Sequence, residues 1–190
     1  MNLVSKDLLG IEELTTEEML LILDTAATMK QALRSGIRKT SHLHGRSVVT
    51  LFYENSTRTR LSFELASKYM GAASANVSAS GSSVAKGENL LDTVRTIERM
   101  GTDILVLRHP HSGAPHRIAP LVSMSIVNAG DGQHEHPTQA LLDLFTIREK
   151  KGRLEGLTVA IIGDVAHSRV ARSNLIGMTR LGMQVRVAGP

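Results

Sequence analysis

The chain has 190 residues, of which 42% are hydrophobic and 21% are charged, and its 22 Lys and Arg against 18 Asp and Glu give a formal net charge of +4. This is an ordinary globular composition, which excludes a collagen, a coil and a disordered tail. The absence of cysteine excludes disulfides, thiolate catalysis, iron–sulfur clusters and Cys-based zinc sites.

Composition also bears on partners and location. No apolar run approaches the roughly 20 residues that a membrane-spanning helix needs, so we expect no membrane partner. The N-terminal segment is charged where a secretory signal needs an apolar stretch, which together with the lack of cysteine predicts a cytoplasmic protein. Aromatic residues make up only 3% and Lys and Arg do not cluster, which argues against nucleic acid and favours a small anionic ligand.

Helices and strands are predicted to alternate along most of the chain. A capping signature at Thr15–Glu18 opens an amphipathic helix that ends near Gly36. The elements that follow are strand 47–53, helix 57–70, strand 73–77, helix 89–100, strand 103–108, helix 115–121, strand 125–128 and a long helix opened by His136-Pro137. Repeated βα units of this kind predict an α/β fold, a mostly parallel sheet with helices on both faces.

The charged run Arg148–Arg153 interrupts the apolar pattern and is the best candidate for a domain boundary. Beyond it the pattern predicts one further βαβ unit, with strand 157–162, helix 168–181 and strand 184–188. One such unit cannot cover both faces of its sheet, so we expect the start of a second, doubly wound α/β domain and a truncated chain. The predicted domains are 1–148 and 149–190.

The sharpest candidate site is Ser56-Thr57-Arg58-Thr59-Arg60, between a predicted strand and a predicted helix. Ligands bind at the carboxyl ends of strands in open α/β sheets, and a helix N-terminus attracts anions with its free N–H groups. Hydroxyls and guanidiniums add phosphate-binding capacity without the glycines of a P-loop. The alternative is a serine cap with solvated charges, but two cations at a helix N-terminus oppose the helix dipole, which favours the anion site.

Other candidate segments lie at the same predicted sheet edge. Taken alone, Arg108 suits a surface salt bridge and His136 a helix cap, but each follows a strand and their convergence with the first segment indicates a shared site. The small-residue loop Ser78–Glu88, which carries Lys86, suits equally a flexible loop that closes over an anion and a plain linker.

Two further patterns need weighing. The segment Gly163–Arg169 repeats the strand, loop and helix arrangement, but one glycine is too few for a dinucleotide site, and Arg169 suits a carboxylate. The pairs His109/His111 and His134/His136 suggest a metal site as an alternative. The chain has no cysteine and no pair of histidines four residues apart on a helix, so a site for an anion is favoured over a site for a metal.

Four segments together resemble the carbamoyltransferases: Ser56–Arg60, Lys86-Gly87-Glu88, Arg108-His109-Pro110 and His136-Pro137-Thr138-Gln139. The resemblance extends over essentially the whole chain, and the segments are highly specific as a set. Within the family the chain is similar to the aspartate carbamoyltransferases, because of Ser82–Glu88 and of Asp131-Gly132 ahead of the last segment. The ornithine enzymes lack the lysine loop.

The resemblance implies residue roles. It implies that the catalytic residues are Arg58, Thr59, Arg108 and His136. It implies that the phosphate of carbamoyl phosphate is bound by Ser56, Thr57, Arg58, Thr59 and Arg108. The carbonyl oxygen would then be bound by Thr59, Arg108 and His136, and the carbamoyl amide by Gln139. The carboxylate of aspartate would be bound by Arg169. It also implies a homotrimer with shared active sites, since Ser82 and Lys86 would reach into the neighbouring subunit. Ser83 is the alternative to Ser82.

The implied activity is transfer of the carbamoyl group from carbamoyl phosphate to the α-amine of L-aspartate, which gives N-carbamoyl-L-aspartate and phosphate in the second step of pyrimidine biosynthesis. The resemblance implies no metal and no organic cofactor, and some family members recruit regulatory or dihydroorotase subunits. Family members continue through a complete second domain that grips aspartate. Two alternatives therefore stay open, a non-catalytic carbamoyl-phosphate-binding or trimer-forming module and a carbamoyltransferase for another amine.

Overall fold

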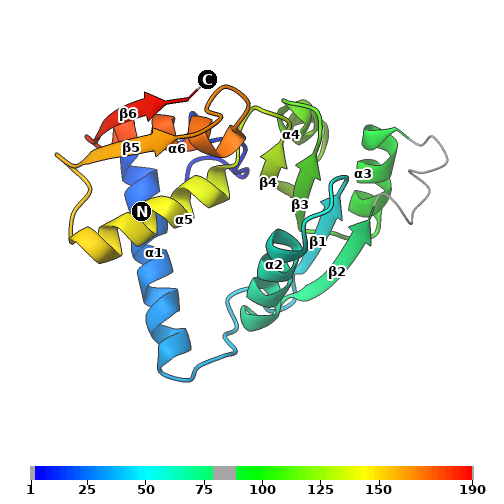
Figure 1. Cartoon of the computed structure of the whole chain (residues 1–190). Coiled ribbons are helices and arrows are strands. Elements are labelled where there is room, and N and C mark those ends of the chain that lie inside the picture. Colours follow the sequence, from blue (N-terminus) through cyan, green and yellow to red (C-terminus); the bar gives the residue numbers. More distant parts are fainter. Residues whose placement is uncertain (1–2, 79–88, 190) are drawn as a thin grey trace.

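The computed structural model describes residues 3–78 and 89–189, which form two parallel sheets and their covering helices (Figure 1). The first sheet contains β1 (Ser47–Phe52), β2 (Ala73–Ser78), β3 (Ile104–His109) and β4 (Ser125–Asp131). Its helices are α1 (Thr16–Arg34), α2 (Thr57–Tyr69), α3 (Leu90–Arg99), α4 (Ala114–Ile118) with the 3₁₀ turn η3 (Ala119–Leu121), and α5 (Pro137–Lys151). The second sheet pairs β5 (Thr158–Ile162) with β6 (Gln184–Ala188) across α6 (Arg169–Arg180).

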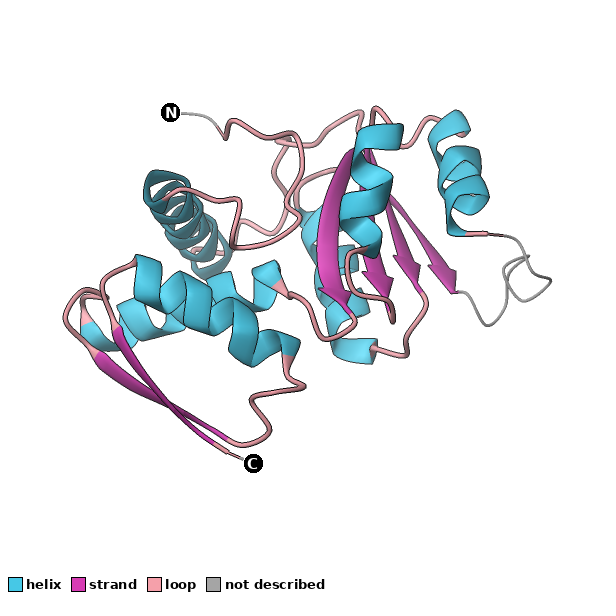
Figure 2. Ribbon diagram, turned by 90° about the horizontal axis from the view of Figure 1, so that it is seen from above, coloured by secondary structure: helices cyan, strands magenta, loops and turns pink. Residues whose placement is uncertain are grey.

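The first sheet has the order β2-β1-β3-β4, and every neighbouring pair is parallel. Apolar side chains project from both faces of this sheet. One face packs against α3 and α4 through Leu107, Val94 and Ile118, and the other packs against α2 through Phe52 and Phe63. The predicted parallel α/β sheet with helices on both faces is therefore confirmed, and Figure 2 shows its four strands side by side between the helices.

The N-terminal segment ties the first sheet to the helices beside it. Leu8 pairs with the edge strand β4, its N–H donating to the carbonyl of Ile126 and its own carbonyl accepting from the N–H of Asn128, both at 2.9 Å. α1 then begins with a full capping box, in which Thr15 and Glu18 exchange side-chain to backbone hydrogen bonds. The sequence signature at this position predicts the helix start correctly.

A separate core joins α1, α5 and α6. Its buried side chains come from both sides of the predicted domain boundary: Ile11, Leu14, Met19, Leu23, Ala140, Leu141, Leu144, Leu154, Met178, Leu181 and Met183. The βαβ unit after α5 thus buries one face against these helices, whereas Ile162 on β5 is 80% exposed. The predicted βαβ unit is present, and its sheet is covered on one face.

Three element boundaries differ from the sequence-based expectation. α5 continues to Lys151, so most of the predicted linker Arg148–Arg153 is the last turn of a helix, and the chain turns at Gly152 with φ of +72°. The helix expected at 115–121 changes to a 3₁₀ turn where Pro120 lacks an N–H donor. β4 extends three residues beyond Asn128, because Asp131 pairs with His109 after a register shift. The division at 148/149 stays a prediction.

Over the described residues, no helix is long and apolar enough to cross a membrane.

Candidate functional site

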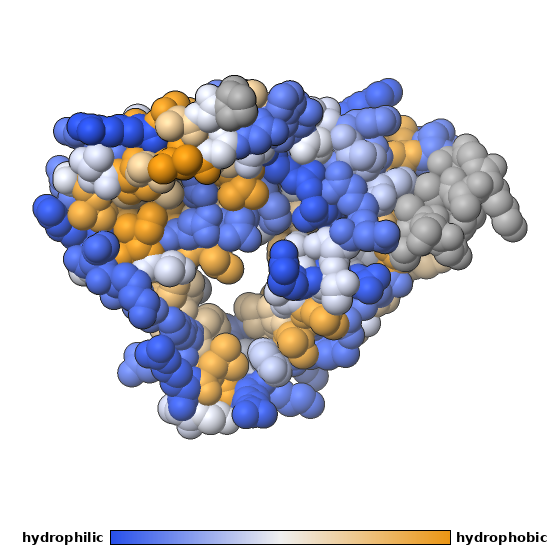
Figure 3. Space-filling model, viewed as in Figure 1, coloured by the Kyte–Doolittle hydropathy of each residue, from blue (hydrophilic) through white to orange (hydrophobic). Residues whose placement is uncertain are grey.

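The carboxyl ends of β1, β3 and β4 and the start of α6 surround one cleft of about 880 Å³. Because parallel strands all end at the same sheet edge, loops far apart in the sequence meet there. The space-filling view is hollowed between α1 and α5 on one side and α2 on the other (Figure 3). The lining residues are Asn55, Ser56, Thr57, Arg58, Thr59, Ser62, Phe63, Ala66, Arg108, His136, Thr138, Gln139, Leu142, Arg169 and Val170.

The start of α2 has the properties of an anion site. Ser56 is the N-cap residue with extended backbone, yet within the described part of the chain its side chain makes no capping hydrogen bond. No acidic residue lies in the first turn of α2, whereas α1 and α3 both carry one or more there. The partial positive charge of this helix end is therefore uncompensated, and Arg58 adds a full charge. A phosphate would balance both the partial charge of the helix end and the charge of Arg58.

Glu54 holds two arginines of the cleft. Arg108 Nε donates to Glu54 Oε2 at 2.9 Å, and Arg169 Nη2 donates to the same oxygen at 2.7 Å. Arg169 Nη1 also donates to the carbonyl of Gly132 at 3.0 Å, and Arg108 Nη1 to that of Ala129 at 3.4 Å. Two cations from different parts of the chain thus share one internal carboxylate.

Glu54, Arg108 and Arg169 form a triad whose electrostatics follow from its burial and charge. Burial by itself would raise the pKa of Glu54, but the hydrogen bonds and charges of Arg169 and Arg108 outweigh it, so the pKa is lowered and the carboxylate stays ionised. Burial and the neighbouring Arg169 lower the pKa of Arg108, and Glu54 opposes this. The net positive charge of the triad suits an incoming anion.

His136 is buried at the N-cap of α5 as a neutral imidazole. Burial, followed by the charges of Arg108 and Arg169, lowers its pKa from the ordinary 6.5 to about 4. Its Nδ1 lies 3.3 Å from the hydroxyl of Thr138. A hydroxyl that donates to Nδ1 leaves the ring proton on Nε2, so His136 can donate a hydrogen bond without carrying charge.

The backbone of His136 is also fixed. Its N–H donates to Ser173 Oγ at 2.9 Å, and Ser173 Oγ in turn donates to the fully buried Glu135 at 2.8 Å. Glu135 also accepts from the N–H of Ile11 at 2.8 Å. The backbone of His136 is therefore held by a chain of bonds that runs from α6 to the N-terminal segment.

Gln139 lies one turn into α5. Its amide nitrogen donates to Asp143 Oδ1 at 2.9 Å, and Asp143 Oδ2 accepts from Asn174 at 2.7 Å. With its nitrogen held in this way, the side-chain carbonyl of Gln139 is the group left to accept a hydrogen bond from a ligand amide.

Gly130 allows the close approach of Arg169 to the end of β4. Its φ is +114°, and a Cβ built there would lie 2.9 Å from Arg169 Nε and 3.3 Å from His136 Cδ2. Any side chain at this position would displace the two residues that the cleft needs.

Eight residues predicted from the sequence line this one cleft: Ser56, Thr57, Arg58, Thr59, Arg108, His136, Gln139 and Arg169. Ser82, Ser83 and Lys86 lie outside the described residues. Glu54 is a functional residue that sequence reasoning missed. Its signal was available, since Glu54 is the acidic residue between the end of β1 and the cationic start of α2.

The two candidate metal pairs do not form sites as pairs. The rings of His109 and His111 contact each other edge to face, with centroids 4.9 Å apart. His136 faces the anion cleft, whereas His134 bonds to Asp131 at 3.1 Å. The expectation that an anion fits the cleft better than a metal stays a prediction.

The fold and the cleft define an α/β protein with an arginine-lined cleft at the carboxyl edge of a parallel sheet. Residues 6–149 match the family described as "Aspartate/ornithine carbamoyltransferase, carbamoyl-P binding domain". The chain belongs to the aspartate/ornithine carbamoyltransferase family.

Relatives agree with this assignment. The chain is 66% identical over all of its 190 residues to the aspartate carbamoyltransferase catalytic subunit of Ruminiclostridium cellulolyticum, and covers 61% of that protein. It matches the solved catalytic subunit of M. jannaschii aspartate transcarbamoylase with a TM-score of 0.90 and 40% identity, over 98% of this chain and 61% of that one. The Trypanosoma cruzi enzyme with carbamoyl phosphate and aspartate gives a TM-score of 0.88 at 35% identity, over 95% and 56%. The chain thus spans about three fifths of the length of these relatives.

Proposed function

We propose that the chain belongs to an aspartate carbamoyltransferase, which transfers the carbamoyl group of carbamoyl phosphate to the α-amine of L-aspartate. The observation that carries the proposal is the convergence of the uncompensated N-terminus of α2, Arg58, Arg108 and neutral His136 on one cleft. Names of relatives support the choice of substrates, because the T. cruzi structure contains carbamoyl phosphate and aspartate.

In this proposal the phosphate binds at the start of α2, where Ser56, Thr57, Arg58 and Thr59 offer hydroxyls, N–H groups and a guanidinium. Arg108 contacts both the phosphate and the carbonyl oxygen. Because Glu54 holds Arg108, the incoming dianion competes with an internal carboxylate. Binding therefore exchanges one ion pair for another.

The reaction needs stabilisation of one oxygen. The neutral amine attacks the carbamoyl carbon, a C–N bond forms, and negative charge develops on the carbonyl oxygen. The bond from carbon to the phosphate oxygen then breaks, and phosphate leaves with the proton that the amine loses. Thr59, Arg108 and His136 donate to the developing oxyanion, and loss of one such donor typically costs on the order of a hundredfold in rate.

Two further assignments complete the proposed site. The carbonyl of Gln139 accepts from the carbamoyl NH₂, and Arg169 contacts a carboxylate of aspartate. Holding the two anionic substrates side by side supplies much of the remaining rate enhancement. The chemistry uses no side-chain nucleophile.

We also propose a homotrimer with active sites shared between subunits, in the cytoplasm. The support is the resemblance of Ser82–Glu88 to the family's lysine loop, together with the position of β2. β2 is the edge strand of the first sheet and leads directly into that segment. Ser82 and Lys86 are then the residues that a neighbouring subunit receives, and regulatory or dihydroorotase subunits are further partners.

The experiment that tests the function is a calorimetric titration of the 190-residue chain with carbamoyl phosphate, with its mass in solution measured alongside. We expect binding that Arg58→Ala weakens at least tenfold. Arg60→Ala is the matched control, because it removes the same charge from the same helix at a residue that does not line the cleft. Absence of binding by a folded chain, or equal weakening by both variants, would overturn the phosphate site.

The product identifies the acceptor. Incubation with carbamoyl phosphate and L-aspartate, followed by mass spectrometry, is expected to give N-carbamoyl-L-aspartate in a preparation that carries a complete second domain. Carbamoylation of another amine such as ornithine instead would identify a different carbamoyltransferase. Binding without any product would identify a carbamoyl-phosphate-binding module.

A further inference from the structure

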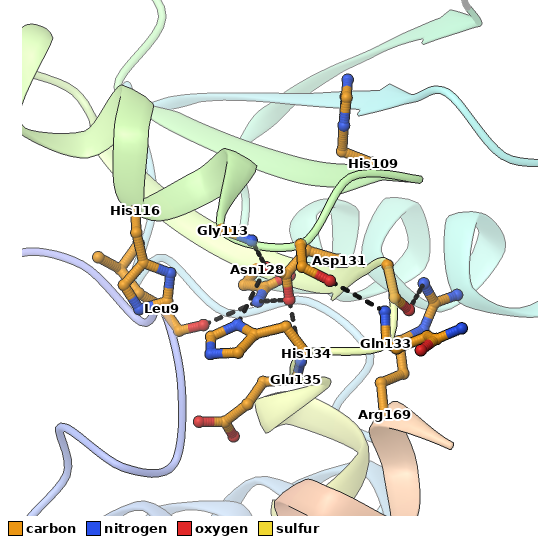
Figure 4. Close-up of polar contacts among 12 residues, drawn as sticks. Leu9, His109, Gly113, His116, Asn128, Asp131, Gln133, His134, Glu135 and Arg169 are labelled. Carbon is orange, nitrogen blue, oxygen red and sulfur yellow. Dashed lines mark hydrogen bonds and ion pairs between the residues drawn. The ribbon is translucent and has the colours of Figure 1, made fainter. Parts of the chain in front are cut away.

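Outside the cleft, three residues that could ligate a metal lie together where α4 meets the loop between β4 and α5. One ring nitrogen each from His116 and His134 and one carboxylate oxygen of Asp131 all lie within 4.8 Å of one another. The two imidazole rings meet edge to face with centroids 5.2 Å apart. Figure 4 shows both rings and the Asp131 carboxylate gathered on the side away from Arg169.

We propose that His116, Asp131 and His134 form a binding site for a divalent transition-metal ion such as Zn²⁺. Imidazole nitrogen and carboxylate oxygen are ligands that Zn²⁺ prefers, and three protein ligands with a water molecule complete its usual tetrahedral shell. None of the three residues lines the anion cleft, so the proposal is independent of the proposed function.

The hydrogen bonds of His116 are compatible with a metal ligand. Its Nε2 lies 2.7 Å from Glu13 Oε1, and since an ionised carboxylate only accepts, Nε2 must donate. In a neutral ring the lone pair is then on Nδ1. That nitrogen is buried, and it has no hydrogen-bond partner among the described residues. A carboxylate that fixes the ring in this tautomer is the usual outer partner of a metal-bound histidine.

Asp131 is fully buried and already oriented. Its Oδ1 accepts from Asn128 Nδ2 at 2.9 Å and from the N–H of Glu135 at 3.0 Å, and its Oδ2 accepts from the N–H of Gly113 at 2.6 Å (Figure 4). These bonds fix the carboxylate in place, which lowers the entropy lost when it becomes a ligand.

The third ligand, His134, lies with its Nδ1 3.1 Å from Asp131 Oδ2. Binding replaces this hydrogen bond: the ring proton of His134 moves to Nε2, and its Nδ1 turns to a metal ion that the fixed Oδ2 of Asp131 also contacts. Ligand atoms around tetrahedral Zn²⁺ lie roughly 3.3 Å apart, so the two rings must close on the ion. The side chains of His116 and His134 are 30% and 24% exposed, which leaves them room to turn toward the fixed carboxylate of Asp131.

Charge favours a dication at this point. Asp131 and the neighbouring Glu13 bring two carboxylates to the cluster, and these attract a dication. Bound metal would cross-link α4 to the loop that precedes α5. The sequence spacing gave no sign of this set, because the two histidines are far apart along the chain and the carboxylate lies between them.

The test is a calorimetric titration of the untagged, chelator-treated chain with Zn²⁺ at pH 7, repeated with Co²⁺ to record the visible absorption of a tetrahedral site. We expect one equivalent bound at micromolar or tighter affinity, and His116→Asn and His134→Asn each to weaken it at least tenfold. His167→Asn is the matched control, because His167 makes the same type of contact to Asp164 at 2.9 Å on an exposed loop. It should leave binding unchanged.

Two results would overturn the proposal. One is the absence of binding at 100 μM Zn²⁺, and the other is an affinity for Zn²⁺ in either His116→Asn or His134→Asn that stays within threefold of the parent. Circular dichroism with chelator checks that the variants fold. Should either variant fail to fold, histidine ¹H–¹⁵N spectra of the parent decide instead: Zn²⁺ must shift the ring signals of His116 and His134 and leave those of His167 in place.

Discussion

Glu54 connects the two halves of the anion cleft through a single side chain. It follows β1, whereas Arg108 ends β3 and Arg169 begins α6, so three chain segments meet at one carboxylate. Its side chain is 28% exposed, and the two guanidiniums are 15% and 14% exposed. Arginines this far removed from water need an anion, and Glu54 supplies one.

Replacing Glu54 with Gln should separate its structural role from ligand binding. We expect the free energy of unfolding to fall by about 1–3 kcal/mol, because two partly buried cations lose their partner. Inorganic phosphate should then raise the melting temperature of Glu54→Gln more than that of the parent, since the arginines are free to accept it. Thermal unfolding with and without phosphate measures both effects.

Glu64→Gln is the control for this change. It also removes a carboxylate from a salt bridge, but that bridge joins Glu64 to Lys68 across one turn of the surface of α2. Little change in stability and no change in the phosphate effect are expected. An equal phosphate effect in Glu54→Gln and the parent would contradict the competition between Glu54 and the ligand.

His136 makes a prediction about pH. Its pKa of about 4 in the folded chain lies below the ordinary 6.5, so between these values the unfolded chain takes up a proton that the folded chain refuses. Stability from this group is complete above pH 6.5 and is lost as the pH falls toward 4, by about 3 kcal/mol in total. In His136→Gln, the free energy of unfolding should therefore depend less steeply on pH over this interval.

Denaturant unfolding at half-unit steps from pH 7 to pH 4 measures the slope. His42→Asn is the control, because His42 is exposed and does not line the cleft. Carboxylates whose pKa is lowered, such as Glu54, contribute to acid unfolding in all three proteins and cancel in the comparison. Parallel pH curves for His136→Gln and the parent would mean that folding does not shift the pKa of His136.

At the scale of elements, two serines look alike in the sequence and behave differently in the structure. Ser56 and Ser168 each stand directly before a helix whose first turn contains arginine. Ser168 Oγ accepts from the N–H of Ala171 at 3.2 Å, which caps α6. Ser56 makes no such bond within the described part of the chain, so its hydroxyl is left for a ligand.

The pair of alanine variants distinguishes these roles. Ser168→Ala should lower the free energy of unfolding by about 1 kcal/mol, the usual effect of losing an N-cap, and leave carbamoyl phosphate binding unchanged. Ser56→Ala should do the reverse, with stability within about 0.5 kcal/mol of the parent and weaker binding. Each variant serves as the control of the other. A stability loss in Ser56→Ala equal to that in Ser168→Ala would make Ser56 an ordinary cap.

The elements themselves were largely predictable because their signals are local. The capping box at Thr15, the proline at the start of α5 and the alternating apolar runs of the strands each depend on a few neighbouring residues. The end of β4 was not predictable, because its extension to Asp131 depends on pairing with His109 on another strand. Contacts between distant segments leave no local trace.

The same distinction explains the site. Residues at strand ends could be gathered from topology alone, since a parallel sheet brings its carboxyl ends to one edge. Glu54 and Gly130 were missed because their importance depends on where Arg169 lies, and that is set by the packing of α6. The group His116, Asp131 and His134 depends in the same way on how α4 lies against the following loop.

At the scale of the whole molecule, the apolar side chains form separate cores. One set lies on the two faces of the first sheet and includes Leu105, and another joins α1 and α5 to α6 and includes Leu144. The second core draws residues from both predicted domains, so α1 and α5 stabilise the βαβ unit, and α5 also contacts β4 of the first sheet. Arg180 on α6 strengthens this connection by donating to the carbonyls of Ile11 and Glu12 at 3.1 and 3.0 Å.

Leu144→Ala tests how far these cores unfold independently. Leu144 is fully buried, so truncation should lower the free energy of unfolding by about 2–5 kcal/mol. We expect amide hydrogen exchange to accelerate most in α1, α5, α6 and the β5–β6 sheet, and least in β1 and β3. Leu105→Ala, at an equally buried position in the first sheet, should give the reverse pattern. Uniform acceleration in both variants would instead mean that the molecule unfolds as one cooperative unit, with α1 and α5 transmitting every loss of packing from one sheet to the other.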